Sequence, residues 1–227
     1  MKRQTPKTIS AIVPVYNEES TVASVVRALL SNPIFSEVIC VDDGSSDRSL
    51  RILRGFGEAI TRIEVERNRG KGNALARGVA AARGELVLFV DADLTNLSDE
   101  HLAAMLAPIL RAEADAVLGY CRRRAIPNLT AHLTGQRVYR RSDLLPHLER
   151  MSPSRFGVEV LLNELFQGKR VKMVPLRGLV GLTKVEKRSP RKAAREYADE
   201  VLEVAWQWLR GRTVLSRLAV SLNGREW

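Results

Sequence analysis

Aromatic residues and cysteines are both scarce in this 227-residue sequence. Phe, Trp and Tyr together make up 5% of the residues, which argues against a surface that binds single-stranded nucleic acid by stacking bases on aromatic rings. The two cysteines, Cys40 and Cys121, do not have the spacing of a metal site, and Cys40 lies inside an apolar run. We therefore expect a buried free thiol in a reducing compartment, not a disulfide.

Long apolar segments are missing as well. No stretch approaches the ~18 uninterrupted apolar residues that predict a transmembrane helix. The basic N-terminal residues are not followed by the apolar segment of a signal peptide. These absences predict a cytoplasmic protein whose contact with a membrane is at most peripheral, at the inner face.

Acidic residues are outnumbered by basic ones, 26 to 36, which gives a formal net charge of +10. An excess of this size indicates a polyanionic partner. Three kinds of partner fit: a nucleic acid, an anionic membrane surface or a phosphorylated substrate.

Short apolar runs alternate with longer segments of helical periodicity, as in proteins built from β-α units around a mostly parallel sheet. The expected strands are residues 8–15, 37–43, 61–68, 85–91, 115–120 and 170–176. Segment 121–157 breaks this regularity and is too long for a simple connector, so we expect it to serve the acceptor side of a site. Residues 189–227 have the pattern of one or two amphipathic helices.

Two carboxylates follow the fourth expected strand, at the point where a buried strand should end. Asp91 and Asp93 lie one residue apart there, and charged groups in a core are costly unless they have partners. Ser98, Asp99 and Glu100 need no ligand to explain them, because a serine N-cap followed by acids is typical of a helix start. Asp91 and Asp93 therefore keep two interpretations: they cap the helix, or they hold a ligand.

Four polar stretches lie at the carboxyl ends of successive expected strands: PVYNEE (14–19), DDGSSD (42–47), NRGKGNA (68–74) and DAD (91–93). Acids and glycines are common in such loops, so one stretch alone indicates only turn chemistry. In open α/β sheets, however, ligands bind beyond the carboxyl ends of the strands. Four stretches at one edge therefore predict a ligand site.

The order and spacing of VPVYNEE, VDDGSSDRS, NRGKGNALARG and DADL resemble the family 2 glycosyltransferases of the GT-A fold. The resemblance is strong over residues 8–120 and weaker over TGQRVYRRSDLL and FGVEVLLNE. Within the family it is greatest to the short members that are similar to dolichol-phosphate-mannose synthase. It implies an α/β domain of the GT-A type over residues 1–188, with a mostly parallel sheet flanked by helices, and a basic C-terminal helical extension over residues 189–227.

In that family DAD is the DXD motif. The resemblance implies that Asp91 and Asp93 bind Mg²⁺ or Mn²⁺, which bridges the diphosphate of a nucleotide-sugar donor, and that Asp93 is also catalytic. Hard cations prefer carboxylate and phosphate oxygens, and such an ion can act as a Lewis acid on the departing nucleoside diphosphate. The mannose-synthase-like members often carry an extra Gln ligand where this sequence has Thr95. His132 is either a third metal contact or a polar loop residue.

The resemblance also implies a set of donor-binding residues. They are Pro14, Tyr16, Glu18, Val41, Asp43, Lys71, Val90, Asp91, Ala92, Asp93, Arg122 and Arg137. Asp43 resembles the acid that reads the base edge, and Lys71 lies in a glycine-flanked loop that suits phosphate. The alternatives are that Tyr16 packs on the core and that Lys71 is simply solvated.

Family 2 enzymes invert the anomeric carbon by direct displacement, and the need for a base depends on the acceptor. A hydroxyl acceptor must give its proton to a carboxylate, for which Glu159 is the candidate; the alternative for Glu159 is a surface position on a helix. A lipid phosphate is already anionic and needs no base. In that case Arg122, Arg137 and the basic cluster 184–192 would position it, and Gln136 lies where similar enzymes contact the acceptor or the diphosphate.

The basic cluster 184–192 precedes a segment that carries Trp206, Trp208 and Leu209. Basic residues beside Trp and Leu at helical spacing suit the surface of an anionic bilayer. The alternative is a C-terminal helix that packs its apolar face on the sheet.

We therefore expect a metal-dependent, inverting transferase that moves a hexose from a UDP- or GDP-sugar to a polyprenyl phosphate. The same donor chemistry on a soluble hydroxyl or phosphorylated acceptor is the first alternative. A nucleotidyltransferase is more distant, because the glycine-rich basic signature after the first strand is missing. A nucleic-acid-binding protein would explain the charge but not the four polar stretches, so no nucleic acid is expected as a partner. The sequence predicts no oligomeric state.

Overall fold

A computed structural model describes residues 8–121 and 131–181 of the chain. Arg122, the basic cluster 184–192 and the expected C-terminal extension over residues 189–227 lie outside the described residues. The division of the chain at residue 188 therefore stays a prediction.

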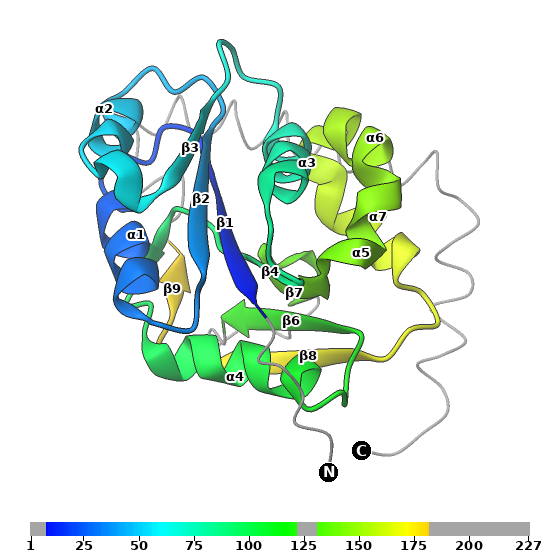
Figure 1. The fold of residues 1–227 in the computed structure, drawn as a ribbon. Helices are drawn as coiled ribbons and strands as arrows, with labels where there is room; N and C mark the ends of the chain where they lie inside the picture. The colour runs from blue at the N-terminus through cyan, green and yellow to red at the C-terminus, as the bar shows by residue number, and fades with distance from the viewer. Residues whose placement is uncertain (1–7, 122–130, 182–227) are drawn as a thin grey trace. The chain divides into compact units, whose positions relative to one another are not determined.

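A seven-stranded sheet in the order β3-β2-β1-β4-β7-β6-β8 forms the centre of the domain (Figure 1). Its strands are β1 (Ile9–Val15), β2 (Glu37–Asp42), β3 (Thr61–Glu64), β4 (Leu86–Phe89), β6 (Ala116–Cys121), β7 (Gln136–Arg140) and β8 (Val171–Leu176). The strands β1 to β4 are parallel, as are β6 and β8, whereas β7 runs antiparallel to both of its neighbours. A small second sheet pairs β5 (Leu94–Thr95) with β9 (Val180–Gly181).

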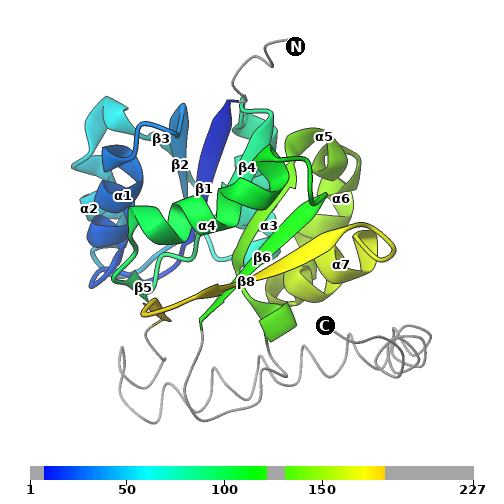
Figure 2. The ribbon, with the colours of Figure 1, turned by 90° about the horizontal axis from the view of Figure 1, so that it is seen from below.

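Helices cover both faces of the large sheet (Figures 1 and 2). The helices α1, α2 and α4 lie on one face, and α3, α6 and α7 lie on the other. The α-helices are α1 (Val22–Ser31), α2 (Ser49–Arg54), α3 (Lys71–Ala81), α4 (Asp99–Leu110), α5 (Arg141–Leu144), α6 (Leu148–Met151) and α7 (Val158–Leu165). The 3-10 turns are η1 (Gly57–Ala59), η2 (Ala131–Leu133), η3 (Leu145–His147) and η4 (Ser152–Gly157).

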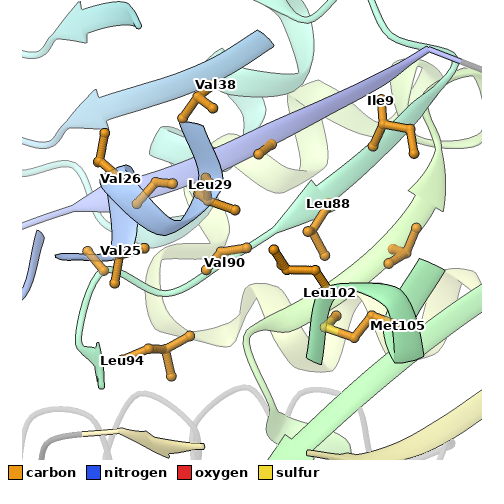
Figure 3. Packing of buried hydrophobic residues seen from close by; sticks show 14 of the residues in the cluster. Ile9, Val25, Val26, Leu29, Val38, Leu88, Val90, Leu94, Leu102 and Met105 are labelled. Atoms are coloured by element: carbon orange, nitrogen blue, oxygen red, sulfur yellow. The ribbon is translucent and has the colours of Figure 1, made fainter. Parts of the chain in front are cut away.

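The central strand β1 is apolar because both of its faces are buried. Successive side chains of a strand point to opposite faces, so Ile9 and Val13 pack with α1 and α4, whereas Ile12 packs with α3. Figure 3 shows the first of these two cores, where Leu29 of α1 and Met105 of α4 face the sheet. Helices on both faces are what a parallel sheet requires, and they leave the strand ends as the place for polar side chains.

The α/β class and the mostly parallel sheet are confirmed, and so is the helix start at Ser98. This residue has extended backbone angles ahead of α4, and its N–H donates to His101 Nδ1 over 3.2 Å. Strand β7 was not expected. It lies in the irregular segment 121–157 and inserts between β4 and β6, which brings that segment into the middle of the sheet.

Candidate active site

The carboxyl ends of β1, β2 and β4 lie at one edge of the sheet, because these strands are parallel and adjacent (Figure 1). Val15, the last residue of β1, pairs with Asp42, the last residue of β2. The loops that follow these strands therefore start at the same level. Three of the four polar stretches leave the sheet at this edge, and the fourth follows β3 beside them.

The first two loops are locked to each other. Asn17 has a positive φ of 57°, a conformation that asparagine tolerates better than most residues, and its Oδ1 accepts a hydrogen bond from Ser46 N over 2.7 Å. In return, Ser45 Oγ accepts from Asn17 N at 3.0 Å, and Ser49 Oγ accepts from Glu18 N at 2.7 Å. These reciprocal bonds hold the PVYNEE and DDGSSD loops as one unit.

Asp43 ties the second loop to the third. Its buried carboxylate accepts backbone hydrogen bonds from Arg69 N at 3.0 Å and from Gly70 N at 2.7 Å. Gly44 has φ of 74°, and a Cβ there would collide with the backbone of Arg67, so only glycine allows this approach. Asp43 thus orients the start of α3; its contact with a nucleobase stays a prediction.

Lys71, the first residue of α3, lies between two carboxylates. Its Nζ is 2.6 Å from Asp91 Oδ1 and 2.7 Å from Glu159 Oε1, and 19% of its side chain is exposed. Burial by itself lowers the pKa of Lys71, but the two carboxylates outweigh burial and hold that pKa above its ordinary value. The alternative of a simply solvated lysine is wrong, since the ammonium is enclosed and paired.

Glu159 comes from α7, on the far side of Lys71. Glu159 is 8% exposed, and its helix neighbours Val158 and Leu162 are buried as well. The alternative of a surface position on the helix is therefore wrong. A buried carboxylate needs a partner, and Lys71 provides it; the role of Glu159 as a general base stays a prediction.

The start of β7 and the two residues before it hold Asp91 from the other side. Gln136 Nε2 donates to Asp91 Oδ2 over 2.8 Å, and Thr134 Oγ1 donates to Gln136 Oε1 over 2.6 Å. Gly135 packs directly against the Asp91 carboxylate, so a Cβ at this position would overlap its oxygen atoms. The sequence interpretation named Gln136 but missed Gly135 and Thr134; the available signal was a glycine directly before that glutamine.

Arg137 is buried, with 1% exposure, and it stabilises the residues just before β7. Its guanidinium donates to the carbonyl oxygens of Thr134 and His132, at 2.7 and 2.6 Å, and to Asn163 Oδ1 at 2.9 Å. His132, the candidate third metal contact, is exposed. This arrangement gives Arg137 a structural role that was not foreseen, and its contact with a donor or acceptor stays a prediction.

Asp93, the second acid of DAD, lies beside the small sheet. A Cβ at Gly181 would be 3.7 Å from Asp93 Oδ1, so β9 passes close to this carboxylate. Thr95 Oγ1 donates to the carbonyl oxygen of Val180 over 3.2 Å. Thr95 therefore links the DAD loop to β9.

The remaining donor-site candidates divide by exposure. Tyr16 is 38% exposed, so the alternative that it packs on the core is wrong. The side chains of Val41, Val90 and Ala92 are buried, and Pro14 is half-buried. The contact of these residues with a donor stays a prediction.

Two negative findings hold for the described residues. Within residues 8–121 and 131–181, no group of three or more His, Cys, Asp or Glu side chains is arranged to hold a metal ion. In the same part of the chain, no helix is both long and apolar enough to cross a membrane.

Known proteins with similar sequences support the resemblance. The sequence model described as "Glycosyl transferase family 2" matches residues 10–166. A dodecaprenyl-phosphate galacturonate synthase of Rhizobium johnstonii is 35% identical over 124 residues, which are 51% of this chain and 36% of that protein. A glucosyl-3-phosphoglycerate synthase of Mycolicibacterium smegmatis is 34% identical over 125 residues, or 52% of this chain and 41% of that protein. The chain thus spans less than half the length of these curated relatives.

A solved structure agrees with the fold. Glucosyl-3-phosphoglycerate synthase from Mycobacterium tuberculosis, in complex with Mn²⁺, UDP-glucose and glycerol 3-phosphate, superposes with a TM-score of 0.65 at 25% identity. The superposition covers 87% of this chain and 80% of the other. Because the family model covers more than half of the sequence and the folds agree, the chain belongs to glycosyl transferase family 2.

Proposed function

We propose that this chain catalyses the metal-dependent, inverting transfer of a hexose from a UDP- or GDP-sugar to an acceptor that bears a phosphate, with polyprenyl phosphate as the first choice. The observation that carries the proposal is the pair Asp91 and Asp93 at the end of β4, with the ammonium of Lys71 2.6 Å from Asp91 Oδ1. Carboxylates and a cation at a sheet edge suit a metal-bound diphosphate.

The donor set fits Mg²⁺ or Mn²⁺. Asp91 and Asp93 offer hard oxygen ligands, and the side chain of Asp91 is 25% exposed. Mg²⁺ is usually held by one or two carboxylates together with phosphate oxygens and water, so a cluster of three protein ligands is not needed. When bound, the ion neutralises charge on the departing nucleoside diphosphate.

The chain itself contributes positive potential for the diphosphate. Asp43 holds Gly70 and the first turn of α3 in place, and the N-terminus of a helix favours anions. Lys71 places an ammonium at the same point, where Asp91 and Glu159 offset its charge as long as no metal is bound. Asp93 is the catalytic carboxylate of the proposal, because it lies beside Asp91 in the DXD motif.

The burial and ion pairing of Glu159 favour a phosphate as the acceptor group. Its carboxylate is buried and paired with Lys71, which does not suit a group that must take a proton from a hydroxyl. A phosphate acceptor is already anionic and needs no base. Relatives named for polyprenyl phosphates, among them an undecaprenyl-phosphate 4-deoxy-4-formamido-L-arabinose transferase of Pseudomonas aeruginosa, support a lipid phosphate.

A soluble phosphorylated acceptor is the second candidate. It is favoured by the relatives named glucosyl-3-phosphoglycerate synthase and by the superposed structure with glycerol 3-phosphate. If the acceptor carries its reactive group as a hydroxyl, Glu159 is the proposed base.

The test is a transfer assay with UDP- and GDP-sugars, Mn²⁺, and either undecaprenyl phosphate or 3-phosphoglycerate as the acceptor. We expect metal-dependent product from wild type and a large loss in Asp93→Asn. The proposal would be contradicted if neither removal of the metal with EDTA nor Asp93→Asn lowered the amount of product. Product with 3-phosphoglycerate alone would reject the lipid acceptor and keep the donor chemistry.

A further inference from the structure

Lys71 already occupies one of the proposed metal ligands. Its Nζ lies 2.6 Å from Asp91 Oδ1, the distance of a strong charge-assisted hydrogen bond. The second oxygen of the same carboxylate accepts from Gln136 Nε2 at 2.8 Å. Asp91 is therefore held by a cation from α3 on one oxygen and by an amide from β7 on the other.

Glu159 shares the same ammonium. Its Oε1 is 2.7 Å from Lys71 Nζ, and its side chain is 10% exposed. Lys71 is thus an ion-pair partner of this buried carboxylate. A buried carboxylate that loses its partner is strongly destabilising, so Lys71 cannot leave Glu159 at low cost.

We propose that Lys71 is a resident counter-ion that occupies Asp91 until a divalent cation replaces it, and that Glu159 is a positioning residue that retains the displaced ammonium in the site. The inference rests on the proposed function. An ammonium and a divalent ion cannot share one carboxylate oxygen without strong repulsion. The other oxygen of Asp91 already accepts from Gln136. In the proposed exchange the metal therefore takes the place of the ammonium on Oδ1, and Lys71 keeps its bond to Glu159.

This exchange couples the metal to the donor. A metal that arrives alone must displace Lys71 from Asp91, and the displaced charge then has only Glu159 as a partner. A nucleoside diphosphate brings negative oxygens that give the ammonium a second partner again. Each ligand thus makes the other bind more tightly, and this coupling is reciprocal. The chain would take up metal together with the donor and hold metal weakly without it.

The experiment measures the affinity for Mn²⁺ by isothermal titration calorimetry, without nucleotide and with saturating UDP or GDP, whichever the wild type binds. The central variant is Lys71→Met/Glu159→Gln, which removes one positive and one negative charge and so keeps the net charge of the cluster. We expect it to bind Mn²⁺ alone at least about fivefold more tightly than wild type and to lose most of the coupling to the nucleotide.

Two further variants separate the proposed exchange from general effects. Glu159→Gln leaves Lys71 to Asp91 alone and should weaken the binding of Mn²⁺ without nucleotide, a result that does not require the double variant to fold. Lys172→Met/Glu113→Gln is the matched control. It removes a 2.6 Å ion pair on the surface, whose side chains are 53% and 42% exposed, and neither residue belongs to the DAD loop or its contacts. It should leave both affinities at their wild-type values.

The outcomes distinguish this inference from the proposed function. If wild type binds Mn²⁺ with nucleotide but the central variant binds Mn²⁺ alone no more tightly than wild type, the exchange is wrong and the donor site stands. An unchanged or tighter affinity in Glu159→Gln would also overturn the exchange. If wild type shows no binding of Mn²⁺ even with nucleotide, or binding that Asp93→Asn does not weaken, the proposed function itself fails.

Discussion

Gln136 donates a hydrogen bond from Nε2 to Asp91 Oδ2 over 2.8 Å, and so connects β7 to the acid pair at the end of β4. The two strands are neighbours in the sheet, but they are separated along the chain by α4 and β6. The irregular middle segment of the sequence, which was expected to serve the acceptor side, therefore holds Asp91, the first acid of the proposed donor site.

Replacement of Gln136 by Leu should loosen Asp91 without unfolding the protein. A hydrogen bond to a charged group contributes about 1.5–3 kcal/mol, so we expect kcat/KM to fall by roughly 10- to 100-fold with little change in Tm. The measurements are steady-state kinetics and thermal unfolding. Gln167→Leu, at an exposed position, is the control; an equal loss of activity there would contradict a specific role for Gln136.

Gly135→Ala should impair the binding of metal and nucleotide, because the added methyl group overlaps the Asp91 carboxylate. Gly168→Ala is the matched control, since Gly168 has φ of 80° and open space around it. Alanine there costs about 1 kcal/mol of backbone strain and should lower stability without affecting binding. Calorimetry with UDP and Mn²⁺ checks both, and normal binding in Gly135→Ala would show that Asp91 can shift freely.

Arg137→Met should destabilise the fold, because it removes a buried guanidinium that donates to the carbonyl oxygens of Thr134 and His132. The His132 oxygen keeps its bond from Asn163 Nδ2, so the loss falls mainly on Thr134 and on the buried guanidinium. We expect a loss of about 2–4 kcal/mol in the free energy of unfolding, measured by urea denaturation. Arg150→Met removes an ion pair whose arginine side chain is 51% exposed and should change stability by less than about 1 kcal/mol. Unchanged stability together with weaker donor binding would instead make Arg137 a substrate contact.

Cys40 should make the protein less stable at alkaline pH. Burial raises the pKa of its thiol to about 12, from an ordinary value of 9.0. The folded state therefore keeps the proton over a range in which the unfolded chain loses it, and stability falls between these two values by about 1.4 kcal/mol per pH unit. Urea unfolding of wild type and Cys40→Val at pH 8 and pH 10 checks this. Between pH 8 and pH 10 the variant should lose less stability than wild type. An equal loss in both proteins would mean that groups other than Cys40 cause the pH dependence.

The peripheral membrane contact expected from the sequence depends on residues outside the described ranges. The basic cluster 184–192 and the tryptophans Trp206 and Trp208 predict binding to anionic vesicles. We expect the full chain to sediment with phosphatidylglycerol vesicles at low salt, and Trp206→Ala/Trp208→Ala to do so several-fold less. Equal sedimentation of the two proteins, or none with wild type, would contradict a membrane role for this segment.

Local sequence was sufficient for the β-α order and the helix start at Ser98. These features depend on the periodicity of apolar residues and on short-range capping, and both act within a few residues. The convergence of the four polar stretches was also predictable, since parallel neighbouring strands must end at the same edge. The stretches that carry Asp91 and Lys71 were thus expected at the same edge of the sheet.

Tertiary structure decided what these residues contact. The antiparallel entry of β7 between β4 and β6, the burial of Arg137 and the shared ammonium of Lys71 between Asp91 and Glu159 all join segments that are distant in the chain. No local pattern encodes such contacts, because the partner of a strand edge or a buried charge is chosen by the packing of the whole domain. For this reason the sequence suggested Glu159 as a base, whereas the fold presents it as the partner of Lys71.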